Sequence, residues 1–113
     1  MKKLLLNLVI IISVFGSVAT HASQEESEAM YAYQGQDYPA AIQQYLRLNQ
    51  AHPSWIWDYN LGNAYYKNGQ YGWAIYYYRL ALSQSPRDGD IRHNLAQARS
   101  QRIDDIPARK GLD

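Results

Sequence analysis

The 113-residue sequence contains no cysteine, and its positive and negative residues nearly balance at a formal net charge of +1. Without cysteine we expect no disulfide, no thiol redox catalysis and no lipid attachment through a cysteine. The near-neutral charge leaves no basic surface of the kind that nucleic-acid binding requires. We therefore expect no nucleic-acid partner.

The sequence patterns of catalytic and metal sites are also missing. There is no glycine-rich phosphate loop, no serine in a nucleophile context, and no pair of His, Asp or Glu with the spacing of a metal site on one helix. Glu25, Glu26 and Glu28 fall in a first helical turn, where acidic side chains favour the helix dipole. We expect no enzymatic activity, no cofactor and no bound metal.

The N-terminus has the layout of a secretory signal peptide over residues 1–22. Two lysines precede an apolar stretch at residues 4–18, and residues suited to cleavage follow. We expect cleavage after Ala22, with a cut after Ala19 as an alternative, and hence a periplasmic or secreted protein. The other interpretation is an uncleaved inner-membrane anchor, although the apolar stretch is shorter than the roughly 20 residues of a membrane span.

The chain is rich in tyrosine, and its aromatic and small residues follow a recurring order. Between residues 60 and 86, small side chains stand where two antiparallel helices cross closely, and large ones fill the crossing. A proline after them ends the second helix. The residues that define this unit are Leu61, Gly62, Tyr65, Ala74, Tyr78, Ala81 and Pro86.

The same order recurs on both sides of this unit. Five residues are each followed by an identical residue 33 positions later: Tyr38, Ala41, Ile42, Tyr45 and Pro53. Asn94 follows Asn60 by 34 positions. The spacing predicts an all-α solenoid of about two and a half helix–turn–helix repeats. The expected helices are 24–35, 38–51, 55–68, 71–84 and 89–103. The expected units are repeat one at about 23–54, repeat two at about 55–88, a terminal capping helix at about 89–103, and a polar tail at 104–113.

Residues 60–86 resemble the tetratricopeptide repeat, with Asp58 in place of the first tryptophan of its motif. Residues 59–66, 74–78 and 90–95 are similar to the BatE-type tetratricopeptide proteins of the bacterial aerotolerance operon. This resemblance implies a protein–protein interaction module that acts as an adaptor or scaffold in a cell-envelope complex. It further implies von Willebrand factor A domain proteins as partners.

In tetratricopeptide arrays the first helices of successive repeats line a concave groove, and the resemblance implies a partner-binding site there. Asn60 and Asn94 share one repeat position, where an amide can donate to and accept from a peptide backbone. An equally weighted alternative is that both asparagines only tie adjacent helices together. The expected groove residues are Tyr59, Asn60, Asn63, Tyr66, Lys67, His93, Asn94 and Gln97.

The groove lacks the cations of the carboxylate-gripping tetratricopeptide type. Glu26, Met30 and Asp90 stand at the corresponding places. A ligand that ends in free carboxylates is therefore not expected. Aromatic and amide residues favour a mixed polar and apolar peptide, or a helix of a partner protein.

The second helix of repeat two carries an additional aromatic stripe, opposite the side that packs inward. Tyrosine and tryptophan are enriched at contact hot spots, so this stripe is expected to dock on a partner, on a second copy or on a membrane surface. Simple exposure of amphipathic rings is the alternative. A second candidate function is a cell-wall or glycan-associated accessory protein that uses this surface. The stripe consists of Trp73, Tyr76, Tyr77 and Leu80.

Overall fold

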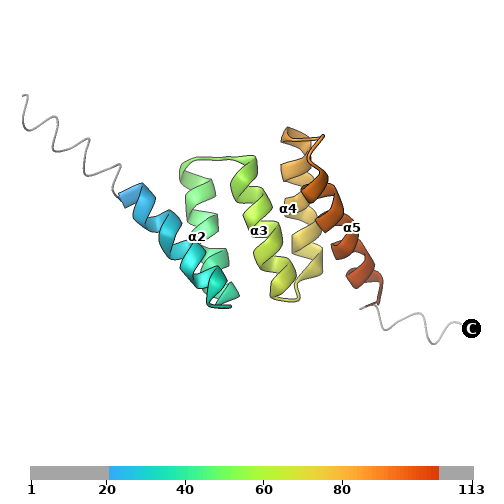
Figure 1. Cartoon of the computed structure of the whole chain (residues 1–113), viewed down its shortest axis with the longest axis horizontal. Helices are drawn as coiled ribbons and strands as arrows, with labels where there is room; N and C mark the ends of the chain where they lie inside the picture. The colour runs from blue at the N-terminus through green and yellow to red at the C-terminus, as the bar shows by residue number, and fades with distance from the viewer. Residues whose placement is uncertain (1–20, 105–113) are drawn as a thin grey trace, which may run out of the picture.

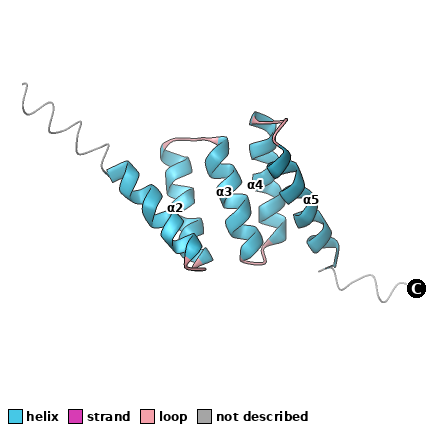
Figure 2. Ribbon diagram, viewed as in Figure 1, coloured by secondary structure: helices cyan, strands magenta, loops and turns pink. Residues whose placement is uncertain are grey.

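The computed structural model describes residues 21–104, which form five consecutive α-helices joined by short turns (Figures 1 and 2). The predicted all-α helical array is confirmed. The expected signal peptide and polar tail lie almost entirely outside the described residues. The first helix occupies residues 21–34 and is followed by α2 (Tyr38–Ala51), α3 (Trp55–Lys67), α4 (Tyr71–Gln84) and α5 (Gly89–Asp104).

Most predicted helix limits agree with these bounds to within a residue. The first helix differs most, since it is already formed at residue 21 rather than starting at 24. Polar side chains cap α2 and α3: Asp37 accepts a hydrogen bond from the Ala40 amide, and Ser54 accepts one from the Ile56 amide, both at 3.2 Å. Asp88 accepts from the Asp90 amide at 2.9 Å before α5. Such caps satisfy amide groups that have no partner within the helix.

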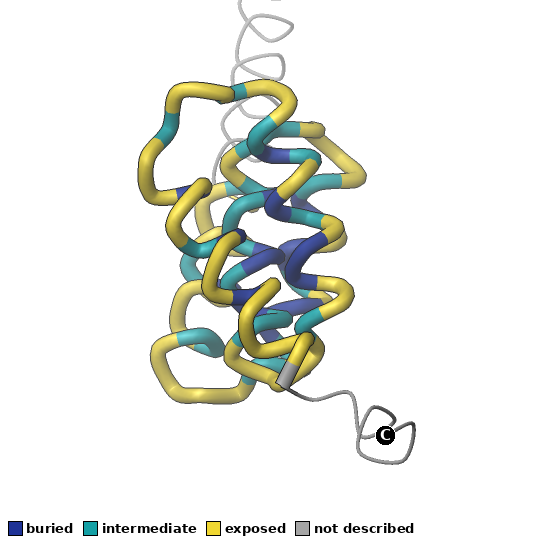
Figure 3. Tube along the Cα trace, turned by 90° about the vertical axis from the view of Figure 1, so that its right-hand side faces the viewer, coloured by how far each residue is buried: buried dark blue, intermediate teal, exposed yellow. Residues whose placement is uncertain are grey.

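The helices form two layers. In Figure 1 the first helix, α3 and α5 lie nearer the viewer than α2 and α4. The view turned by 90° shows the buried segments between the layers and exposed turns outside (Figure 3). One set of buried residues joins the first helix, α2 and α3, and the other joins α4 and α5. The half-buried Tyr65 of α3 packs against both sets and so links the two halves of the core.

The crossing of α3 and α4 depends on a glycine. A Cβ added at Gly62 would lie 2.5 Å from two ring carbons of Tyr78, which is almost fully buried. Only a residue without a side chain allows this approach. Within the unit predicted from sequence, Leu61, Gly62, Ala74, Tyr78 and Ala81 are buried, while Pro86 follows the end of α4 on the surface.

Candidate partner-binding groove

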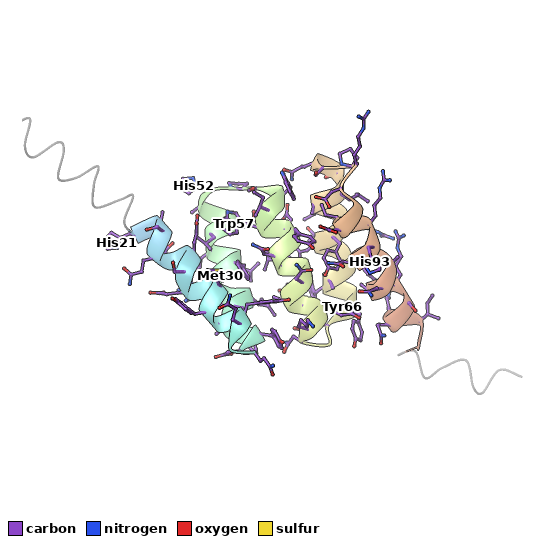
Figure 4. The ribbon with its side chains drawn as sticks, viewed as in Figure 1. His21, Met30, His52, Trp57, Tyr66 and His93 are labelled. Atoms are coloured by element: carbon purple, nitrogen blue, oxygen red, sulfur yellow. The ribbon has the colours of Figure 1, made fainter. Side chains whose placement is uncertain are left out.

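Two hollows lie along the layer formed by the first helix, α3 and α5. The first has a volume of about 500 Å³ and is lined from the first helix, α2 and α3. The second, of about 260 Å³, is lined from the first helix, α3, α4 and α5. Both share Tyr33 and Asn63, so they form one groove that runs across three helices. Met30, Trp57 and Tyr66, which line it, are labelled in Figure 4.

The first hollow has aromatic walls and a polar rim. The Tyr45 and Trp57 rings stack with centroids 6.1 Å apart, and Tyr33 lines the same hollow beside the exposed side chain of Met30. Burial raises the pKa of the Tyr33 and Tyr45 hydroxyls, which keeps both phenols neutral. The polar side chains at this hollow are Ser23, Glu26, Ser27, Asn60 and Asn63.

The second hollow contains a network of hydrogen bonds between helices. The Tyr78 hydroxyl donates to Asn63 Oδ1 at 2.6 Å. Asn94 Nδ2 donates to Asn63 Oδ1 and to the Tyr59 hydroxyl, both at 3.1 Å. Asn94 therefore ties α5 to α3.

Asn60 differs from Asn94 although the two share a repeat position. The Asn60 side chain lines the first hollow and forms no hydrogen bond with any residue that the structure describes. Its amide can therefore donate to and accept from a bound peptide backbone without first breaking an internal bond. The structure thus separates a pair that sequence position had treated as equivalent.

The remaining expected groove residues divide into two sets. Tyr66, Lys67 and Gln97 line the second hollow. Tyr59 instead packs into the core between α3 and α5, with its ring centroid 6.1 Å from that of Tyr78. His93 is exposed on α5 and lines neither hollow.

Tyr33 and Trp57 line the groove but were not placed there from the sequence, whereas Met30 was already assigned to a groove position. Tyr33 precedes Tyr66 by 33 positions, and this spacing could have identified it. Trp57 had no such signal. Its place in the groove depends on its stacking against Tyr45 of α2, which a repeat position does not determine.

The aromatic stripe on α4 is only partly free of contacts with α3. The Tyr77 ring lies face to face with Tyr65, with centroids 5.5 Å apart and planes 8° apart. Trp73 also stacks on Tyr65, at 5.9 Å, yet its side chain remains 54% exposed, and Tyr76 is 51% exposed. Leu80 is half-buried. The accessible part of the stripe is therefore Trp73 and Tyr76.

Asp58 occupies the motif position of the missing tryptophan and is buried. Its carboxylate accepts hydrogen bonds from Asn49 Nδ2 of α2 at 2.9 Å and from Gln84 Nε2 of α4 at 3.5 Å. Burial raises the pKa of Asp58, and the hydrogen bond from Asn49 opposes this rise. The residue joins three helices through polar contacts where the motif has an aromatic ring.

Within residues 21–104, no helix is long and apolar enough to cross a membrane. The same part of the chain holds no group of three or more His, Asp or Glu side chains that could bind a metal ion. The features that the described residues do offer are a groove, an amide without a partner and exposed aromatic rings.

Antiparallel helix pairs stacked in sequence, with a groove along one layer, define a helical-repeat protein. The family model of the tetratricopeptide repeat matches residues 59–88, which cover most of α3, all of α4 and the turn toward α5. The chain thus carries a tetratricopeptide repeat at these residues. A search of curated proteins found no match.

Proposed function

We propose that this chain is an adaptor that binds a peptide segment or helix of a partner protein in the groove between the first helix, α3 and α5. One observation carries the proposal: the unpaired Asn60 amide lies in a hollow walled by Tyr33, Tyr45 and Trp57. Aromatic walls supply apolar contact area at low entropic cost, and an amide fixes the register of a bound backbone. The tetratricopeptide repeat supports a role in protein binding.

We further propose that the chain is exported and acts in a bacterial cell-envelope complex. The signal-peptide layout of residues 1–22 supports export, and the similarity to the aerotolerance-operon proteins suggests a von Willebrand factor A domain protein as the partner. Fractionation of cells that express the full chain, with N-terminal sequencing of the product, tests export. Recovery of uncleaved chain in the cytoplasm would contradict it.

Site-specific photo-crosslinking tests the groove. A photoreactive amino acid at Met30, 49% exposed at the first hollow, should crosslink to a protein in the envelope. The matched control is the same amino acid at Leu46, which is 37% exposed on α2 and lines neither hollow. Crosslinks at Met30 that Asn60→Ala reduces would support the groove. Equal crosslinking at both positions would contradict it.

A second candidate function is binding of cell-wall glycan at Trp73 and Tyr76. Trp73 packs against Tyr65, Tyr76 and Tyr77 yet remains half exposed, so the exposed part of its ring can contact a sugar ring. In a chain carrying Trp55→Phe and Trp57→Phe, the remaining Trp73 fluorescence should respond to soluble cell-wall fragments if this function holds. If the Trp73→Ala chain binds soluble cell-wall fragments as tightly as the natural chain does, this surface is excluded as the glycan site.

A further inference from the structure

A third hollow, separate from the groove, lies between α4 and α5 at the C-terminal end of the helical array. It has a volume of about 310 Å³, with Ile75 buried in it and Ile103 70% exposed beside it. Three arginines surround these apolar groups: Arg79 of α4, and Arg99 and Arg102 of α5. The end of the helical array is thus both apolar and basic.

Contacts with the described residues do not explain these arginines. No side chain that the structure describes forms an ion pair or hydrogen bond with any of the three. The dipole of α5 favours a cation in its last turn, which accounts for Arg102. It does not account for Arg79, which lies in the middle of α4. Unpaired guanidinium groups around an apolar hollow fit a ligand with carboxylates beside an apolar side chain.

The opposite end of the same molecule has this chemistry. The first helix carries Glu25, Glu26 and Glu28, all exposed, and Tyr31 is 70% exposed one turn after Glu28. The charged Glu28 and the exposed ring of Tyr31 are thus about one helical turn apart on the first helix. The charged Arg99 and the exposed Ile103 have a similar separation on α5. The first helix and α5 lie at opposite ends of the array (Figure 1).

We infer that copies of this chain associate end to end, with the acidic first helix of one copy docked in the basic hollow between α4 and α5 of the next. The two contacting surfaces differ, so the contact is heterologous and each added copy presents the same two free ends. Attraction between the acidic end and the basic end favours this orientation. Repulsion between like charges opposes contact between two acidic ends or two basic ends. The inference does not depend on the proposed groove, although the acidic end and the groove share Glu26, which also lines the first hollow.

Sedimentation velocity of the protein purified from cells that express the full chain tests the inference. The weight-average mass should rise to twice the monomer mass or more as concentration increases from about 5 to about 500 µM, a range that covers weak association. Raising the salt from about 0.05 to about 0.5 M should return it toward the monomer mass, because screening weakens contacts between exposed charges.

Charge reversal identifies the ends. The basic-end variant, Arg99→Glu with Arg102→Glu, and the acidic-end variant, Glu25→Lys with Glu28→Lys, should each remain monomeric. An equimolar mixture of the two should associate, since each keeps one natural end. The control is Arg47→Glu, a reversal at an exposed residue of α2 outside both ends, which should associate as the natural chain does.

A second measurement covers the case in which a reversed chain does not fold. The sequence has no cysteine, so Tyr31→Cys and Ile103→Cys chains can be mixed and treated with a flexible thiol crosslinker. Mixed dimers should then exceed twice the amount of either identical dimer, which is the ratio that random pairing of equal amounts gives. A natural chain that stays monomeric at low salt, reversed variants that associate like the natural chain, or crosslinks without preference for the mixed pair would each overturn the inference.

Discussion

The first helix with α2, and α3 with α4, are two helix pairs that build the same turn from different residues. Tyr33 meets Tyr38 edge-on with centroids 5.6 Å apart, and Tyr66 meets Tyr71 in the same way at 5.4 Å. A repeat can thus preserve the contact of its aromatic rings while the residues around that contact change.

The two helix pairs differ in the residue at the helix crossing and in the residue with left-handed backbone conformation in the turn. The second pair has Gly62 at its close crossing and Gly69 in the left-handed turn, at φ 75°. The first pair has the buried Ala29 at the equivalent crossing and Gln36 in the turn, at φ 63°. The second pair is therefore the less strained at its turn and the less tolerant of an added methyl group at its crossing. Exchanging residues between the pairs tests this comparison.

Gly62→Ala should have the largest effect. The new Cβ would meet the Tyr78 ring at 2.5 Å, and Tyr78 is held by its hydrogen bond to Asn63. We expect a loss of about 1–3 kcal/mol in the free energy of unfolding, as for overpacking of other cores. Urea denaturation measures it.

Gly72→Ala is the matched control, because a Cβ there has no neighbouring atom within 4 Å. In the first turn of α4 this change should be neutral or stabilise by up to about 1 kcal/mol. Equal destabilisation by both substitutions would show that the close crossing is not the cause.

Asn94→Ala should have the next largest effect. It removes two hydrogen bonds that tie α5 to α3, at a cost of about 1–2 kcal/mol in the free energy of unfolding. Asn60→Ala, at the equivalent position of α3, should change stability little, since the Asn60 amide has no partner among the described residues. Thermal melting of both variants checks the difference. Equal melting temperatures would contradict the separate roles of the two asparagines.

Gln36→Gly should stabilise the chain. It places in the first pair the residue that the second pair has at Gly69 and relieves a left-handed backbone conformation. The gain should be about 0.5–1 kcal/mol, and Gly69→Gln should cost a similar amount. Denaturation of both variants measures the two changes. A loss of stability on Gln36→Gly would indicate that the Gln36 side chain contributes more than its backbone strain removes.

The smallest effect is expected at the start of α4. Asp37 caps α2 with its side chain, whereas Gln70 at the equivalent position makes no cap bond to α4. Gln70→Asp should add about 0.5 kcal/mol of stability, and Asp37→Gln should remove a similar amount. Melting temperatures that do not change for either variant would show that these caps are not limiting.

The helix limits could be predicted from the sequence because they depend on local signals: capping residues, turn glycines, and the recurrence of tyrosine and alanine at fixed spacing. The buried positions of Leu61, Ala74 and Tyr78 follow from the same spacing. Contacts between helices were harder to predict. The bond from Asn94 to Asn63 depends on how far α5 is offset along α3, and the stacking of Tyr77 on Tyr65 depends on a rotamer.

Titration of a groove partner, once photo-crosslinking has identified it, tests the central claim most directly. In a chain with Trp55→Phe and Trp73→Phe, the remaining Trp57 lies in the first hollow and reports on its occupation. Trp57 fluorescence should change on binding. Asn60→Ala should weaken binding about fivefold or more, the value of one hydrogen bond, while the melting temperature is unchanged. Unchanged affinity in Asn60→Ala together with a silent Trp57 would contradict partner binding in this groove.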